Sequence, residues 1–364
     1  MKKYNIALCG AYDILSYGDS LFPVALEYEL KKRIEIENVF LFAPVGNVQC
    51  MSNNAQVHSY SELEQLHEQY HFSAVIIGGG EMLHFSPITF MDSCGKQIKY
   101  NEAELWKVPL EFAKEKGIPS IVNSVGAAHE FDEEQKQILK VTFEKCKYIS
   151  VRDRYSFDRL KKLGIHVELV PDSLWNIGRY LDKGCSLVEG EYVAIQYGTA
   201  YQNAELFDII EEIRKRSNAK IVVLPINYCH EDKVFAEKAR RRFGEEIFIF
   251  DRQLNVNEIY GVIANAKLFV GTSLHGTLTA LSNCVPAIIV DMYPSFVGKM
   301  DGMVEWMQGD LPIVSDVNSL EYYMRGYLDL TKGVNEKCVR EIKETTNHHF
   351  DVIAEKIIED CNNG

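Results

Sequence analysis

A histidine lies where a predicted strand meets a predicted helix, in the segment Leu268–Pro286. The apolar run Leu268–Val270 predicts a buried strand that turns at Gly271, and His275 falls in the first turn of the helix that follows. Such a turn exposes backbone N–H groups at the positive end of the helix dipole, and open α/β sheets bind ligands at the carboxyl ends of their strands. We therefore interpret His275 as an acid–base residue, and the alternative is a histidine that only caps the helix. Its neighbours in the same turn are Thr272, Ser273, Gly276 and Thr277.

Two arginines stand at the end of another predicted strand. The run SVRDR places Arg152 and Arg154 where the strand enters a helix. A guanidinium at this place can grip a phosphate or a carboxylate with two hydrogen bonds, which predicts an anion site. The alternative is a salt bridge to a nearby carboxylate, namely Asp153, Asp158 or Asp172.

Glycines and polar residues follow other predicted strands. Gly18 and Asp19 open the first predicted helix, where Asp19 suits either the N-cap or a contact with a substrate hydroxyl. The run Gly78-Gly79-Gly80 ends the third strand and lets a ligand or the neighbouring domain approach the backbone. It matches neither GxGxxG nor a Walker A loop. His129 follows another strand end and either lines the same cleft or belongs to a surface loop, which is the commoner case.

The other histidines and the cysteines form no recognisable site. His67 and His71 are four residues apart but lack a third ligand, so we predict no metal. We interpret His348 and His349, on the terminal helix, as a solvated pair. Nine cysteines without a CxxC motif indicate free thiols in a reducing compartment.

Composition limits the classes of function. A chain of 364 residues with 46% hydrophobic and 25% charged residues is typical of a globular protein with room for two domains. The net charge of −13 argues against a general binder of nucleic acid or of anionic membranes. The N-terminal apolar run is too short for a signal peptide, and no stretch approaches about 18 uninterrupted apolar residues. We expect a cytoplasmic protein.

Short apolar runs alternate with amphipathic segments throughout, which predicts βαβ units and parallel sheets. The glycine-rich stretch Pro171–Gly190 interrupts this alternation, and we predict the linker there. The expected architecture is two tandem Rossmann-like α/β domains, residues 1–180 and 190–333, and a closing helix in residues 334–364. The predicted strands are Tyr4–Leu8, Val39–Phe42, Ala74–Ile77, Ser120–Asn123, Tyr148–Val151, Val167–Val170, Val193–Gln196, Ile221–Leu224, Ile247–Phe250, Leu268–Val270 and Ala287–Val290.

Taken together, these motifs resemble the polysaccharide pyruvyl transferase family. The most specific matches are Ile149–Leu163, which reads ISVRDRYSFDRLKKL, and the segment Gly271–Ala280, which contains Ser-Leu-His. The other matches are Tyr17-Gly18-Asp19, Ala74–Gly80 and Val170-Pro171-Asp172. They follow one another in the family's order over most of the chain.

The resemblance implies a fold similar to two-domain (GT-B-like) glycosyltransferases, with the terminal helix packed back on the first domain. It implies phosphoenolpyruvate as donor, a nucleotide- or lipid-linked sugar as acceptor, and a pyruvate ketal on a surface-polysaccharide precursor as product. It leaves room for peripheral association with a membrane-bound glycan assembly, implies no cofactor, and names neither the acceptor sugar nor the oligomeric state. His275 matches the family's histidine, and Arg152 an arginine expected at the donor.

The sequence departs from the family at Ser273, where many members have an arginine. If another cation supplies the missing charge, the candidates are Arg154 and Lys299.

The chemistry of ketal formation suits these residue types. A proton must reach the methylene carbon of the enol phosphate, which a histidine can deliver with an effect of roughly 10²–10⁴ in rate. Arginine and backbone N–H groups can hold the departing phosphate. Two other classes remain open, namely a glycosyltransferase that uses a nucleotide sugar and a sugar-binding relative without turnover.

Overall fold

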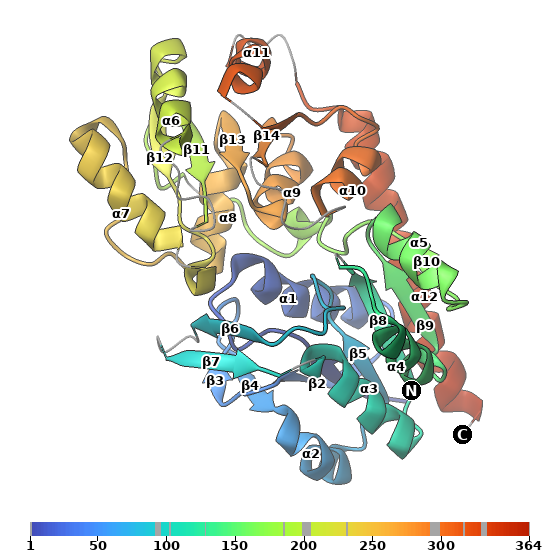
Figure 1. The fold of residues 1–364 in the computed structure, drawn as a ribbon. Helices are drawn as coiled ribbons and strands as arrows, with labels where there is room; N and C mark the ends of the chain where they lie inside the picture. The colour runs from blue at the N-terminus through green and yellow to red at the C-terminus, as the bar shows by residue number, and fades with distance from the viewer. Residues whose placement is uncertain are drawn as a thin grey trace.

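The computed structural model describes residues 2–91, 96–101, 103–127, 129–184, 186–198, 205–230, 232–291, 299–315, 317–328 and 333–363. They form two lobes, each built on its own sheet (Figure 1). The first sheet has the strand order β10-β9-β8-β5-β1-β2-β4-β3 and the second β12-β11-β13-β14-β15. All paired strands within these sheets are parallel except β3, which pairs with β4 in the antiparallel sense.

The strands of the first lobe are β1 (Tyr4–Cys9), β2 (Ile36–Ala43), β3 (Val48–Gln49), β4 (Gln56–Ser59), β5 (Ala74–Ile77), β8 (Ser120–Val125), β9 (Tyr148–Val151) and β10 (Glu168–Leu169), with the separate hairpin β6 (Ile88–Met91) and β7 (Gln97–Tyr100). Its helices are α1 (Tyr17–Lys31), α2 (Leu63–Tyr70), α3 (Glu104–Lys116), α4 (Glu133–Phe143) and α5 (Arg154–Lys162).

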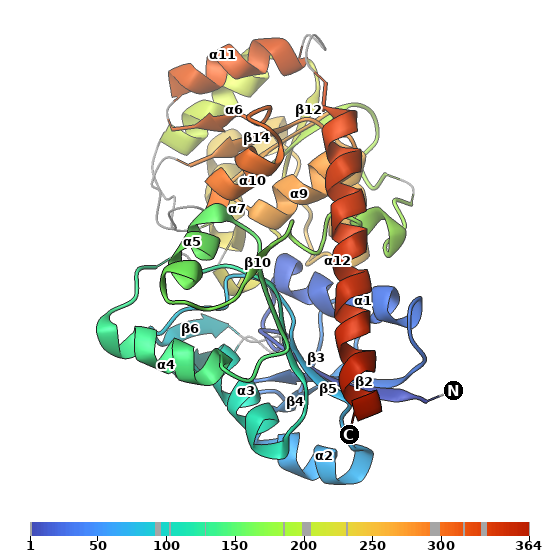
Figure 2. The same ribbon diagram turned by 90° about the vertical axis from the view of Figure 1, so that its right-hand side faces the viewer.

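The strands of the second lobe are β11 (Tyr192–Gln196), β12 (Lys220–Val223), β13 (Leu268–Gly271), β14 (Ala287–Val290) and β15 (Ile313–Val314). Its helices are α6 (Glu205–Arg216), α7 (Asp232–Phe243), α8 (Val256–Ala264), α9 (Leu274–Ser282), α10 (Lys299–Trp306) and α11 (Val317–Leu328). The terminal helix α12 (Glu336–Asn363) runs along both lobes (Figure 2). Short 3-10 turns stand at Tyr60–Glu62, Ile177–Arg179, Tyr228–His230 and Gly244–Glu246.

The central strands are buried on both faces, which is why they are continuous apolar runs. In β1, Ile6 and Leu8 face α1 and α12, whereas Ala7 and Cys9 belong to the core under α2, α3 and α4. The core on the α1 side continues through α8 and α9 onto one face of the second sheet. A third core packs the other face of that sheet against α6, α7 and α11. The predicted pair of open α/β sheets with a returning terminal helix is confirmed, whereas the exact domain boundaries stay a prediction.

One prediction about this architecture is wrong in detail. Ile247–Phe250 is not a strand: only Phe248 bridges to Val222. The stretch Pro171–Gly190 connects the two sheets, and within it Leu174 and Trp175 are buried in the core that both lobes share. Among the described residues, no helix is both long and apolar enough to cross a membrane.

The predicted solvated pair on the terminal helix is also wrong, because His349 is buried. Only His348 of the presumed solvated pair is exposed, whereas His349 is buried. Its ring lies between Tyr148 of β9, whose hydroxyl is 3.0 Å from Nδ1, and Asn123 of β8, whose Oδ1 is 2.8 Å from Nε2. Burial, with a smaller contribution from His348, lowers the pKa of His349 to about 3.

This burial predicts a specific loss of stability in acid. An unfolded histidine binds a proton below pH about 6.5, whereas the folded protein resists protonation of His349 until about pH 3. Stability should therefore fall as the pH drops below about 6.5. His349→Gln should remove about 2 kcal/mol of the wild-type difference between about pH 7.5 and about pH 5, as measured by urea unfolding. His348→Gln is the matched control, and an equal pH dependence in wild type and His349→Gln would contradict the prediction.

Candidate active site

His275 lies in the first turn of α9, directly after β13, as the sequence predicts. The capping role belongs to its neighbour: Ser273 is the N-cap of α9, and its Oγ accepts a hydrogen bond of 3.2 Å from the N–H of Gly276. A serine here therefore has a local physical reason, because it satisfies an amide that has no partner within the helix. The interpretation of His275 as a capping residue is wrong.

The ring of His275 is enclosed by α1 of the first lobe. A β-carbon on Gly18 would collide with Nδ1, so only glycine allows α1 to approach this closely. Phe22, one turn along α1, meets the imidazole edge-on with ring centroids 5.4 Å apart. Tyr17 completes the junction, because its hydroxyl is 3.0 Å from Oγ1 of Thr279 on α9. The structure therefore brings the predicted residues Gly18 and His275 together.

The imidazole also faces a buried carboxylate. Oδ2 of Asp172 is 3.5 Å from Nε2 of His275 and 2.8 Å from Nη1 of Arg152. Nη2 of the same guanidinium is 3.1 Å from Oε2 of Glu81. Burial by itself would raise the pKa of Asp172, but His275 and Arg152 together lower it to about 2. Asp172 is therefore ionised near neutral pH and holds a histidine of one lobe against an arginine of the other.

Arg152 is buried and paired, so the salt bridge to Asp172 offered by the sequence is present. Its role as an anion ligand stays a prediction. Within the described part of the chain, its Nε atom has no hydrogen-bond partner. Its two carboxylate partners differ in access, because the side chain of Glu81 is 19% exposed and that of Asp172 only 5%.

Lys299 joins this cluster as the first residue of α10. It interacts electrostatically with Arg152, Glu81, Asp19 and Asp172, and burial followed by the charge of Arg152 lowers its pKa. Two contacts hold α10 in place: Nε1 of Trp306 donates to the carbonyl of Arg152 at 2.9 Å, and Gly302 packs on Asp153. Residues 292–298, which directly precede Lys299, lie outside the described residues.

The glycine run after β5 fits against side chains of its own lobe. Tyr12 packs on Gly78, and Phe22 packs on Gly79. Gly79 and Gly80 have φ values of +113° and +96°, which favour glycine. A β-carbon on Gly80 would lie 3.1 Å from Oδ1 of Asp19. The neighbour that the sequence assigned to the other domain is thus α1 itself.

The N-cap role offered for Asp19 is wrong, whereas its contact with a substrate hydroxyl stays a prediction. Ser16 is the N-cap of α1, and its Oγ accepts from the N–H of Asp19, which leaves the Asp19 carboxylate near Gly80. The space beside Gly276 is filled by Phe269 and Ile226, so this glycine serves helix packing and leaves no room for a ligand.

Thr272 is held by its backbone and hydroxyl, both of which donate to the side chain of Gln196 at the end of β11. Gln196 in turn donates to Asp232 at 2.8 Å. Burial raises the pKa of Asp232 to about 7, against three N–H donors that lower it. These contacts hold the backbone that leads from β13 into the helical turn that contains His275.

Two other predicted residues, Arg154 and His129, lie at the protein surface. Arg154 is half-exposed and pairs with Glu305 of α10 at 3.3 Å. His129 is exposed in the loop after β8, as the surface-loop interpretation expects. Neither side chain is needed to complete the arrangement around His275.

The model of the polysaccharide pyruvyl transferase family matches residues 17–292, about three quarters of the sequence. The chain belongs to the polysaccharide pyruvyl transferase family. No curated protein matches it. The matched range contains all four residues of the Glu81–Arg152–Asp172–His275 cluster.

Solved structures similar to this family member support its fold. The UDP-GlcNAc 2-epimerase of Neisseria meningitidis, bound to UDP-GlcNAc, aligns with a TM-score of 0.59 and 10% identity over 98% of this chain and 100% of that chain. Staphylococcus aureus MnaA in a co-structure with UDP aligns with 0.61 and 12% identity over 98% and 95%. A glycosyltransferase from Rickettsia africae aligns with 0.61 and 10% identity over 100% of both chains. At these identities the similarity concerns the two-lobed fold alone.

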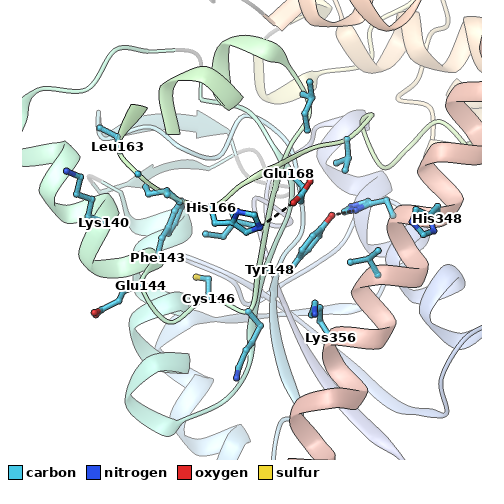
Figure 3. Close-up of a pocket in the computed structure, with 18 of the residues that line it drawn as sticks. Lys140, Phe143, Glu144, Cys146, Tyr148, Leu163, His166, Glu168, His348 and Lys356 are labelled. Atoms are coloured by element: carbon cyan, nitrogen blue, oxygen red, sulfur yellow. Dashed lines mark hydrogen bonds and ion pairs between the residues drawn. The ribbon is translucent and has the colours of Figure 1, made fainter. Parts of the chain in front are cut away.

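A groove of about 900 Å³ lies elsewhere on this family member, between the β9–β10 edge of the first sheet and α12 (Figure 3). Its rim carries Lys140, Lys147, His166 and Lys356, and its lining includes Tyr148 and His349. This groove is not lined by Glu81, Arg152, Asp172 or His275. Cavity size therefore does not locate the candidate active site.

Sequence reasoning missed two members of the cluster as functional residues. The sequence predicts Asp172 only as a salt-bridge partner of Arg152, although it belongs to the Val170-Pro171-Asp172 match. It predicts no role for Glu81, which directly follows the glycine run. In each case the available signal was a carboxylate directly after a strand-end motif.

Close packing at Gly18 leads to a prediction. Gly18→Ala should destabilise the protein by about 1–3 kcal/mol, since the added methyl displaces His275 from a filled space. Gly333→Ala is the matched control, because a β-carbon there meets nothing within 4 Å. Urea unfolding compares the two, and equal stabilities would mean that α1 does not pack on His275 as described.

The Arg152 pairs lead to a second prediction. Arg152→Ala should cost about 3–5 kcal/mol, because Asp172 would remain buried without its guanidinium partner. Arg154→Ala removes a half-exposed pair and should cost less than about 1 kcal/mol. Chemical unfolding of both variants tests the contrast, and similar losses would refute the structural role assigned to Arg152.

Proposed function

We propose that this protein transfers the enolpyruvyl group of phosphoenolpyruvate to a sugar of a cell-surface polysaccharide precursor, forming a pyruvate ketal and releasing phosphate. The observation that carries the proposal is the contact of His275 with Asp172 beside Arg152, inside the range matched by the family. A proton donor and a cation for an anionic donor thus stand within one buried group of side chains.

The reaction needs two additions to one carbon. His275 gives a proton to the methylene carbon of the donor, which becomes a methyl group, and the adjacent carbon becomes oxocarbenium-like. One sugar hydroxyl adds to that carbon and loses its proton. Phosphate then leaves with its bonding electrons, a second hydroxyl adds, and the second proton departs with the phosphate. A histidine suits these steps because it can donate and accept protons near neutral pH.

Asp172 supplies orientation in this scheme. Nδ1 of His275 is covered by Gly18, whereas Nε2 points toward Asp172 at 3.5 Å, longer than a good hydrogen bond. Nε2 is therefore the nitrogen we assign to proton transfer. The donor must enter beside Asp172 to reach it.

Charge governs how the donor is held. The carboxylates that interact with Lys299 include those of Asp19, Glu81 and Asp172. A phosphate or carboxylate of the donor can replace the partly exposed Glu81 on Arg152, and Lys299 can take the place of the arginine that the family often has at position 273. The remaining contacts expected for the sugar come from Asp19 and Thr272 at neighbouring strand ends.

A second candidate function is glycosyl transfer from a nucleotide sugar. The similar structures include proteins bound to UDP-GlcNAc and to UDP, and Ser273 replaces the arginine expected for a phosphoenolpyruvate enzyme. This candidate predicts release of a nucleoside diphosphate and indifference to phosphoenolpyruvate.

Phosphate release from phosphoenolpyruvate across a panel of nucleotide-linked and lipid-linked sugars tests the proposal. His275→Gln should lower turnover at least ~100-fold while leaving phosphoenolpyruvate affinity nearly unchanged, because the acid–base group is lost but Arg152 and Lys299 remain.

His166→Gln, at an exposed histidine, serves as the control and should keep full turnover. A folded His275→Gln enzyme that retains more than a tenth of wild-type turnover would rule out the acid–base role. Release of nucleoside diphosphate without phosphoenolpyruvate would favour the second candidate.

A further inference from the structure

A line of hydrogen bonds crosses the first lobe from the terminal helix to the loops that carry the site. At its outer end, Tyr148 lies beside α12 in the groove (Figure 3). The hydroxyl of Tyr148 donates to Nδ1 of His349, and Nε2–H of His349 donates to Oδ1 of Asn123. This assignment follows because an amide oxygen can only accept, so the neutral ring must carry its proton on Nε2.

The side-chain amide of Asn123 forms hydrogen bonds with both loops that carry the site. Its amide nitrogen donates to the carbonyl of Gly78 at 2.9 Å and to Oγ of Ser173 at 3.2 Å. Gly78 begins the glycine run that precedes Glu81, and Ser173 directly follows Asp172. One amide group therefore contacts the segment leading to Glu81 through its backbone and the segment after Asp172 through the Ser173 side chain.

These polar groups stand where apolar residues would ordinarily be expected. Asn123 and His349 are completely or almost completely buried, and most other buried positions of α12 are apolar, including Ile342, Phe350 and Ile353, although Thr346 is buried as well. Burying an amide and an imidazole costs free energy unless each is hydrogen-bonded, and here each one is. A leucine at position 349 could fill the space without orienting anything.

We propose that His349 is a positioning residue that aligns Asp172 with His275 by fixing the amide of Asn123. The hydrogen bond with His349 fixes which way the Asn123 amide is turned. Because Oδ1 accepts from His349, the N–H groups of the amide point to Gly78 and Ser173. Loss of the His349 bond leaves Oδ1 of Asn123 buried without a donor, which costs free energy. The side chain would then shift toward another donor, and its bonds to Gly78 and Ser173 would weaken.

The effect on turnover rests on the proposed function, so the test has a second readout. His349→Gln keeps an N–H donor near the position of Nε2, whereas His349→Asn reaches only the position of Nδ1. We expect His349→Asn to lower kcat for phosphate release roughly 10–100-fold with little change in KM, since a small misplacement of catalytic groups has this scale of effect. His349→Gln should stay within about threefold of wild type by the same argument. His348→Gln, at the exposed neighbour, should behave as wild type.

The second readout is the nitrogen NMR signal of the His275 ring, which needs no turnover. It should move in His349→Asn and in Ser173→Ala, which removes the hydroxyl that Asn123 contacts, but not in His349→Gln or His348→Gln. An unmoved His275 signal in folded His349→Asn and folded Ser173→Ala would overturn the proposal. So would equal losses of kcat in His349→Gln and His349→Asn. If wild type releases no phosphate, the proposed function fails, and the NMR signals alone then decide the role of His349.

Discussion

The buried carboxylate of Asp172 is the group on which the arrangement of the site depends. It comes from the segment between the two sheets, and it contacts a guanidinium of the first lobe and an imidazole of the second. An ionised carboxylate at this depth is stable only because both partners compensate for its lost hydration. Because both partners must stay close to this carboxylate, Arg152 and His275 are held in fixed orientations. The carboxyl ends of β9 and β13, which carry them, therefore lie near each other.

Close packing makes this electrostatic arrangement precise. α1 lies against the start of α9 because Gly18 has no side chain, Phe22 packs edge-on against the His275 ring, and Tyr17 contacts Thr279 of α9. On the opposite side, Trp306 joins α10 to the Arg152 carbonyl. Helices from both lobes therefore contribute to one continuous core, and the site is formed where that core meets the strand ends.

The terminal helix is also held in place by polar contacts. Besides its apolar contacts, α12 is tied to α1 by Arg33, whose Nε is 2.7 Å from Asp351 and whose Nη2 donates to Asn347. Its buried His349 reaches the sheet interior through Asn123. A helix that only covered a sheet would need neither contact. Its polar anchors connect the outer surface of the lobe with the loops around Asp172.

Hydrophobic periodicity and turn residues act over a few neighbouring positions, so the amino-acid sequence is enough to predict the alternation of strands and helices. It is also enough to place His275 after β13 and Arg152 after β9. The partners of these residues come from the folding of distant segments onto one another: Asp172 with His275, Gly18 against the imidazole, and His349 inside the core. These contacts join positions far apart in the chain. They depend on which strands become neighbours and how two lobes dock, and a one-dimensional pattern does not encode either. For the same reason a histidine on a charged helix looked solvated, although the amide that requires it lies more than two hundred residues earlier.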